Sequence, residues 1–337
     1  MFRFYSDNRD LAVIDLSLNV FLDRKKYRAE DLKFDQDILL ESHWIADLER
    51  TIIEIQTKNP DIVVGINMEY IHSWLASRAF IGFGKNIPNK ANVFFYNILL
   101  NSDLQERLYS DLQASGENVY FDETTSIMYL VPPQDTSNTN YVDACEKLIN
   151  HHLARIVKGI VTKRAHREML SSSNIYTNHY VDVKQLFMQP ENLNTILYYM
   201  TKHLVSKNLE YDAIVSTSKN GAVLATLVGQ LIDKDVVHCV NVGPQFALPI
   251  QAIEEAFQKS KRYVYVCDFI CLGTEVKLLH ALMVSRQAVF AGGVGIANYI
   301  PLCNEDLKSK HSPLASVSCL VDLISAGIPY EIHIMKE

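Results

Sequence analysis

From residue 171 onward, short apolar segments rich in β-formers alternate with helical segments of roughly 10–15 residues, and this alternation restricts the possible folds most. Strands are predicted over residues 211–216, 235–242, 262–268 and 287–296, with helices over 222–232 and from the turn at 269–274 to residue 284. Such a repeat covers both faces of a mostly parallel sheet with helices. The sequence therefore predicts a doubly wound α/β domain over residues 171–337.

Residues 1–135 predict a separate, smaller α/β or α+β domain of unknown role. Strands are expected over 11–16, 61–66 and 92–100, helices over 35–58 and 104–114, and a hairpin over 119–131. The polar, proline-bearing segment 132–140 has no periodicity and is the predicted linker. Residues 141–170 are predicted as one connecting helix, whose basic residues, Lys163, Arg164 and Arg167 among them, are interpreted as a solvated face.

Charge and composition exclude some classes of protein. The net charge of −7 argues against a general nucleic-acid-binding protein, because such domains usually carry a basic excess. Apolar runs stay well short of the roughly 18 residues of a membrane helix, so a cytoplasmic location without membrane partners is expected. The six cysteines are scattered, and Cys267 and Cys271 have no second pair at zinc-ligand spacing, so free thiols and no protein metal site are expected.

Two predicted turns each follow a strand and begin a helix, which is where open α/β sheets bind their ligands. The first turn is Thr217-Ser218-Lys219-Asn220-Gly221, and the second ends in Gly273-Thr274. Exposed backbone N–H groups and the helix dipole favour an anion at such positions. The two turns therefore predict a site for a ligand that carries phosphate.

Three collinear segments resemble the type I phosphoribosyltransferases, and orotate phosphoribosyltransferase in particular. They are residues 173–183 with the helix after Pro190, residues 211–225, and residues 264–274. The last segment falls where the family carries its motif for phosphoribosyl pyrophosphate (PRPP). The resemblance implies that Asp268 is the catalytic residue that holds the ribose hydroxyls. It implies that Cys271, Leu272, Gly273 and Thr274 surround the 5-phosphate, and that Thr217, Ser218, Lys219, Asn220 and Gly221 contact the pyrophosphate.

The same resemblance implies Mg²⁺ bound together with PRPP, and a homodimer. Three features depart from the family's pattern. Cys267 stands in place of the first acid of the motif, and Leu272 and Glu275 stand where small or hydroxyl residues are usual. A carboxylate at position 275 would repel a phosphate unless it points away. Residues 243–250 contain none of the Lys, Arg and His residues of the mobile loop that closes the family's active site.

Three hypotheses follow, and the third of them is a structural or assembly module in which the pocket is vestigial. The first is a divergent phosphoribosyltransferase, a glycosyltransferase that binds PRPP or a nucleotide 5-phosphate and transfers the phosphoribosyl group to a base. The second is a non-catalytic regulatory or assembly protein that senses a nucleotide or PRPP with the same fold. The acceptor base is left open by all three. Tyr180 and Asp182 are interpreted as part of a hairpin rather than of the chemistry.

Overall fold

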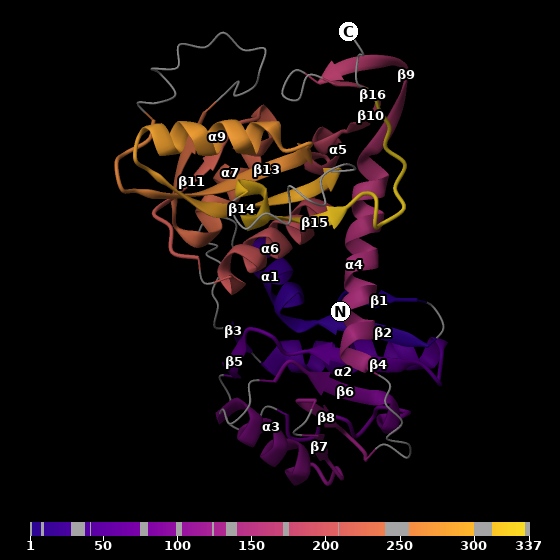
Figure 1. Cartoon of the computed structure of the whole chain (residues 1–337). Helices are drawn as coiled ribbons and strands as arrows, with labels where there is room; N and C mark the ends of the chain where they lie inside the picture. The colour runs from indigo at the N-terminus through magenta and orange to yellow at the C-terminus, as the bar shows by residue number, and fades with distance from the viewer. Residues whose placement is uncertain are drawn as a thin grey trace. The chain divides into compact units, whose positions relative to one another are not determined.

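The computed structural model describes residues 2–7, 10–27, 38–40, 42–74, 80–98, 103–122, 125–132, 140–170, 175–207, 209–239, 256–299 and 312–333 (Figure 1). These residues form two compact units, one up to His152 and one from Leu153 onward. The division falls inside helix α4 (Tyr141–Ile160). Each unit has its own sheet and its own hydrophobic core. Most of the predicted linker, residues 133–139, lies outside the described residues.

The N-terminal unit is built on a mixed sheet in the order β1-β2-β4-β6-β8-β7. Strands β2 (Leu11–Asp15), β4 (Val63–Asn67) and β6 (Val93–Tyr96) run parallel, whereas β1 (Tyr5–Ser6), β8 (Ile127–Tyr129) and β7 (Tyr120–Asp122) pair antiparallel. Its helices are α1 (Leu16–Tyr27), α2 (Ser42–Lys58) and α3 (Asp103–Ala114). The described part of this unit is therefore of the α/β class, which is one of the two classes predicted.

Helix α2 follows the predicted helical spacing of apolar residues, but it begins at Ser42 rather than at residue 35. Its buried face contains Trp44, Ile45, Leu48, Ile52 and Ile55. Residues 38–40 form strand β3 (Ile38–Leu40), which pairs in parallel with β5 (Ile71–Trp74). Pairing between strands far apart in the sequence has overridden the helical pattern here.

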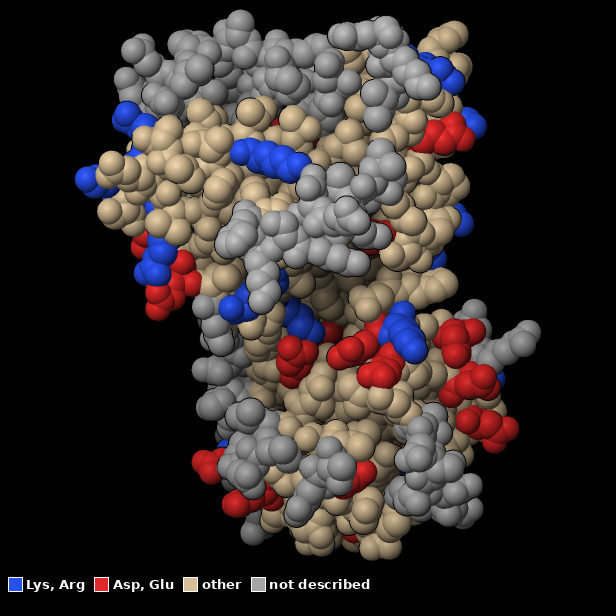
Figure 2. Space-filling model, in the orientation of Figure 1, with Lys and Arg blue, Asp and Glu red and all other residues tan. Residues whose placement is uncertain are grey.

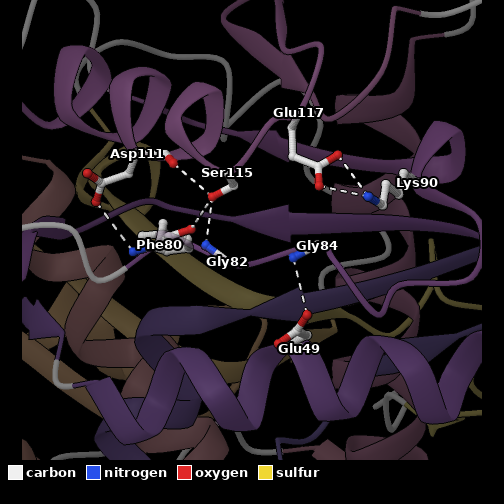
Figure 3. A network of polar contacts seen from close by, with 8 residues as sticks. All are labelled: Glu49, Phe80, Gly82, Gly84, Lys90, Asp111, Ser115 and Glu117. Carbon is white, nitrogen blue, oxygen red and sulfur yellow. Dashed lines mark hydrogen bonds and ion pairs between the residues drawn. The ribbon is translucent and has the colours of Figure 1, made fainter.

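Side chains from α2, α3 and the segment after α3 hold the loop of residues 80–92 (Figure 3). Three loop N–H groups donate to side chains: Phe80 to Asp111 at 3.3 Å, Gly82 to Ser115 at 2.7 Å and Gly84 to Glu49 at 3.2 Å. The loop ends in the 3-10 turn η1 (Lys90–Asn92), where Lys90 Nζ lies 2.7 and 3.0 Å from the two carboxylate oxygens of Glu117. The loop conformation therefore depends on a set of buried and partly buried polar contacts.

Replacing Lys90 with methionine is expected to lower the free energy of unfolding by roughly 2–3 kcal/mol, because the buried Glu117 carboxylate would lose its cation. The Glu117 side chain is only 6% exposed, and that of Lys90 is 29% exposed. Lys58→Met is the matched control, since the Lys58–Glu54 pair is on the surface, with 68% and 32% of the two side chains exposed. Its expected cost is below about 1 kcal/mol. Equal costs in urea unfolding would show that the burial of Glu117 does not matter.

The C-terminal unit contains a sheet of five described parallel strands in the order β12-β11-β13-β14-β15. The strands are β12 (Asp235–His238), β11 (Ala213–Ser216), β13 (Arg262–Cys271), β14 (Val289–Tyr299) and β15 (Val317–Asp322). The central strand β13 is mostly apolar, and seven of its ten residues are buried. Long apolar strands of this kind are typical of parallel sheets that are covered on both faces.

The strand order places helices on both faces of this sheet. Helix α7 (Lys219–Ile232) connects β11 to β12 in one direction, and α9 (Thr274–Ser285) connects β13 to β14 in the opposite direction. Because parallel crossovers are right-handed, opposite directions put the two helices on opposite faces. Helix α6 (Pro190–Ser206) packs on α7 and β14, whereas α9 packs into the buried cluster around Tyr263 and Tyr265. The predicted doubly wound α/β fold is thereby confirmed.

A small antiparallel sheet in the order β16-β10-β9 lies beyond the carboxyl ends of these parallel strands (Figure 1). It consists of β9 (Val161–Leu170), β10 (Ile175–Val181) and β16 (Ile332–His333), and the short helix α5 (Val183–Phe187) follows β10. The helix predicted over residues 141–170 ends at Ile160, and residues 161–170 form β9 instead. Gly159 weakens the helix, and the β-branched Val161 and Thr162 favour the strand that pairs with β10.

Strand β13 is also longer than predicted, because it continues to Cys271 instead of ending at residue 268. Residues 269–271 extend the ladder by pairing with residues 297–299 of β14. The turn before α9 is therefore reduced to Leu272 and Gly273. On the surface, acidic side chains dominate the visible face of the N-terminal unit (Figure 2). Among the described residues, none of the helices is long and apolar enough to cross a membrane.

Candidate ligand-binding site

The two predicted turns lie together at the carboxyl edge of the five-stranded sheet, because β11 and β13 are neighbouring parallel strands. Ser218 is the N-cap of α7, and its Oγ accepts a hydrogen bond of 2.9 Å from the N–H of Gly221. The same hydroxyl donates a hydrogen bond of 2.9 Å to Oδ1 of Asp268. Asp268 is thus fixed at the start of α7, although 50 residues separate it from Ser218.

Gly221 lets α7 begin directly against β13 at Cys267. A Cβ atom at this position would lie 2.6 Å from Ser216 Oγ, 2.7 Å from Ser218 Oγ and 3.4 Å from the Cα of Cys267. The hydroxyl of Ser216 is buried and has no hydrogen-bond partner among the described residues. A side chain at position 221 would separate the helix from the strand and disturb the Ser218–Asp268 contact.

The second turn has two consecutive residues in the left-handed region, Leu272 with φ of 59° and Gly273 with φ of 71°. Gly273 is the N-cap of α9, and among the described residues no side chain caps that helix. The first amides of α9 are therefore open to an anion, and the dipole of the helix adds to the attraction. Thr274, the first residue of α9, is partly exposed beside them. The assignment of this turn to a phosphate stays a prediction.

Glu275 takes part in a chain of hydrogen bonds on the α9 side of the edge. The hydroxyl of Thr217 lies 2.8 Å from the hydroxyl of the buried Tyr265 and also forms a hydrogen bond with Glu275. Burial and then the charge of Asp268 raise the pKa of Glu275 to about 8, partly offset by Thr217. Glu275 is therefore mostly uncharged at pH 7. The predicted repulsion between a Glu275 carboxylate and a bound phosphate is largely absent at that pH.

The two cysteines of β13 are buried and protonated. Burial raises the pKa of the Cys267 thiol well above its ordinary value, and it raises that of Cys271 to about 12. Cys267 Sγ lies 3.8 Å from the carbonyl oxygen of Val294 and so packs against β14. A neutral thiol cannot replace a carboxylate in binding hydroxyls or a cation. Cys271, which the resemblance assigns to the phosphate loop, is the last residue of β13.

Lys219 and Asn220 are the first two residues of α7. Asn220 contacts Tyr180, which the sequence analysis interpreted as part of a hairpin rather than of the chemistry. The Lys219 side chain is exposed, whereas that of Asn220 forms a hydrogen bond with Tyr180 of β10. Burial raises the pKa of Tyr180, and the charges of Asp182 and Asp268 raise it further. The hydroxyl of Tyr180 therefore belongs to the same electrostatic environment as Asp268. The sequence holds no signal for this contact beyond the alternation of residues in β10.

No protein-family model and no curated protein matches this sequence. Solved structures of phosphoribosyltransferases are similar at low identity. The adenine phosphoribosyltransferase of Thermoanaerobacter pseudethanolicus is 12% identical with a TM-score of 0.39, over 50% of this chain and 98% of that one. The orotate phosphoribosyltransferase of Aeropyrum pernix is 14% identical with a TM-score of 0.36, over 52% and 96%.

The UMP synthase of Leishmania donovani is 12% identical with a TM-score of 0.39, and the match covers 84% of this chain. This chain spans 60% of the length of that synthase. These sequence identities and TM-scores are too low to carry an argument about this chain. The α/β assignment therefore rests on the strand order and the crossovers of the chain itself. The roles of Asp268 and of the two turns likewise rest on the contacts described above.

Proposed function

We propose that the C-terminal unit binds a ribose 5-phosphate group, as part of PRPP or of a nucleotide, at the carboxyl edge of its parallel sheet. One observation carries this proposal: the Asp268 carboxylate lies at the start of α7, on the strand that leads into the uncapped N-terminus of α9. A carboxylate accepts hydrogen bonds from ribose hydroxyls, and open amides at a helix N-terminus bind phosphate. The site therefore offers one group for each half of a ribose phosphate.

Magnesium fits this edge if the ligand supplies most of the oxygen atoms. Among the described residues, no group of three or more His, Cys, Asp or Glu side chains could hold a metal. Mg²⁺ commonly uses one or two carboxylates together with substrate phosphates. Asp268 would provide the protein carboxylate, since Glu275 is mostly protonated at pH 7. When bound, the ion would neutralise charge on the leaving pyrophosphate.

Two functions remain for such a site. Transfer of the phosphoribosyl group to a base is the first, and it draws support from the combination of Asp268 with an open phosphate-binding turn. Binding without catalysis, as in a nucleotide or PRPP sensor, is the second, and the buried thiol of Cys267 in place of an acid supports it. Residues 243–250, where a closing loop was expected, lie outside the described residues. The homodimer and the cytoplasmic location also stay predictions.

Asp268→Asn is expected to weaken the binding of PRPP at least tenfold, because hydrogen bonds to a charged acceptor contribute roughly 1.5–3 kcal/mol. Calorimetric titration with PRPP and Mg²⁺ would measure this. Asp235→Asn is the matched control, since Asp235 is exposed at the amino end of β12. The proposal is wrong if the wild-type protein does not bind PRPP at millimolar concentration, or if both variants bind as the wild type does.

The two functions are separated by a second measurement on the same preparation. Phosphoribosyl transfer predicts that pyrophosphate is released from PRPP in the presence of one of a set of purine and pyrimidine bases, and that Asp268→Asn abolishes the release. Sensing predicts binding with no release for any base. The first result establishes an enzyme, and the second favours the non-catalytic function.

A further inference from the structure

Strand β9 contains an irregularity in its pairing with β10 that includes exposed basic residues. Lys163 pairs with His179 and Glu168 pairs with Thr177, so four residues of β9 stand opposite the single residue Asn178. These four residues are Arg164, Ala165, His166 and Arg167, and we call them the basic bulge. All four are exposed. A bulge of this kind bends a strand and redirects its side chains.

Arg164 links the basic bulge to the candidate site. Its guanidinium carbon lies 4.7 Å from the centre of the Tyr180 ring, a cation–π contact. The hydroxyl of Tyr180 in turn forms a hydrogen bond with Asn220 in the first turn of α7. The charge of Asp268 acts on the same hydroxyl and raises its pKa. Blue side chains, with red ones beside them, are visible in Figure 2 on the side where Figure 1 draws β9.

The charge of Arg164 is balanced by an ion pair with Glu168, four residues further along β9. Both side chains are largely accessible to water, with 43% and 55% exposed. Surface ion pairs of this kind contribute little to stability, so exchanging Glu168 for another anion costs little. An arginine fork binds phosphate oxygens in the same bidentate manner as it binds a carboxylate. Glu168 therefore occupies the place that a ligand anion could take.

We propose that the basic bulge binds the diphosphate group of PRPP, with Arg164 leaving Glu168 to pair with phosphate oxygens. This inference rests on the proposed function, because it assigns the diphosphate of the ligand whose ribose phosphate occupies the carboxyl edge. A diphosphate carries several negative charges, and the nearby carboxylates of Asp268 and Asp182 repel it. Binding of a diphosphate beside them therefore requires cations. Lys219 and the basic bulge supply cations on the side of α7 and β10.

The test uses the full chain and three probes: PRPP with Mg²⁺, inorganic pyrophosphate with Mg²⁺, and ribose 5-phosphate. Arg164→Gln is expected to weaken the binding of PRPP and of pyrophosphate roughly tenfold or more, and that of ribose 5-phosphate by less than about twofold. Glu168→Gln is expected to strengthen the binding of PRPP, because the competing carboxylate is removed. Arg262→Gln is the matched control, since Arg262 forms an exposed ion pair with Glu210 at the amino end of β13.

Each outcome decides between the two proposals. If the wild type binds PRPP and loses it in Asp268→Asn, while Arg164→Gln behaves as Arg262→Gln does, the diphosphate assignment is overturned and the proposed function stands. An equal loss for PRPP and ribose 5-phosphate in Arg164→Gln also overturns the assignment. If the wild type binds none of the three probes, the proposed function fails, and this inference fails with it. Thermal unfolding should be the same for Arg164→Gln, Glu168→Gln and Arg262→Gln, because these side chains are largely accessible to water.

Discussion

Replacing Gly273 with alanine is expected to lower the free energy of unfolding by roughly 3 kcal/mol and to weaken the binding of PRPP. Two effects add at this position. The backbone has φ of 71°, which costs an L-residue about 1–2 kcal/mol. The new Cβ atom would also lie 2.4 and 2.7 Å from the two Cδ atoms of Leu314, so either Leu314 or the turn must move. Because Gly273 caps α9, that movement would displace the amides that are open to phosphate.

Gly327→Ala separates the two effects. Gly327 has φ of 62°, and a Cβ atom there would have no heavy atom of the described residues within 4 Å. Its substitution should cost only the backbone strain, about 1 kcal/mol, and should leave the binding of PRPP unchanged. Urea unfolding and calorimetric titration of both variants would measure the difference. Similar stability losses for the two would contradict the assigned role of the Leu314 contact.

Much of the fold could be predicted because its elements are set by local pattern. The apolar runs that became β11, β13 and β14 are bounded by polar turns, and the intervening segment at 219–232 has the spacing of a helix. Strand β9 was missed because its ten residues continue directly from α4 and carry charges at positions that suit a solvated helix. Its pairing with β10, which no local pattern records, stabilises that segment as a strand beyond what Gly159, Val161 and Thr162 indicate.

The candidate site likewise has parts that could be predicted from the sequence and parts that could not. The two turns could be predicted, because a strand followed by Gly, Ser or Thr and then a helix is a local signal. The contact of Ser218 with Asp268 could not, because it depends on β11 and β13 being neighbours. Tyr180 reaches Asn220 only because the small sheet lies beyond the carboxyl ends of the strands. The charge state of Glu275 depends on its burial, which the sequence does not state.

Replacing Glu275 with glutamine is expected to stabilise the chain above pH 8 and to change it little near pH 5. The folded protein holds the Glu275 proton up to a pKa of about 8, whereas an unfolded glutamate releases it near its ordinary value of 4.5. Between these two values the folded state binds more protons than the unfolded state, so wild-type stability falls as the pH rises. The full shift corresponds to at most roughly 5 kcal/mol. Since Glu275 is partly exposed, solvent screening reduces the expected gain to roughly 1–3 kcal/mol.

Urea unfolding of the wild type and of Glu275→Gln at pH 5.5 and at pH 9 would test this prediction. The charged and titratable groups around Glu275 include Asp268, Tyr265 and Cys267. The pKa values of Tyr265 and Cys267 are raised well above their ordinary values, so both stay neutral over this range. Glu210→Gln, at an exposed carboxylate of the same unit, should show no gain that depends on pH. A gain of the same size at both pH values would mean that packing rather than ionisation explains the effect.

The same ionisation should appear in ligand binding. Above pH 8 the Glu275 carboxylate becomes charged beside the open amides of α9, and it then repels a phosphate bound there. The affinity of the wild type for PRPP should therefore fall between pH 7 and pH 9, while that of Glu275→Gln should stay nearly constant. The phosphate itself is fully ionised over most of this range, so its own titration cannot produce the difference between the two proteins. A parallel fall in both proteins would place the phosphate away from Glu275, and hence away from the N-terminus of α9.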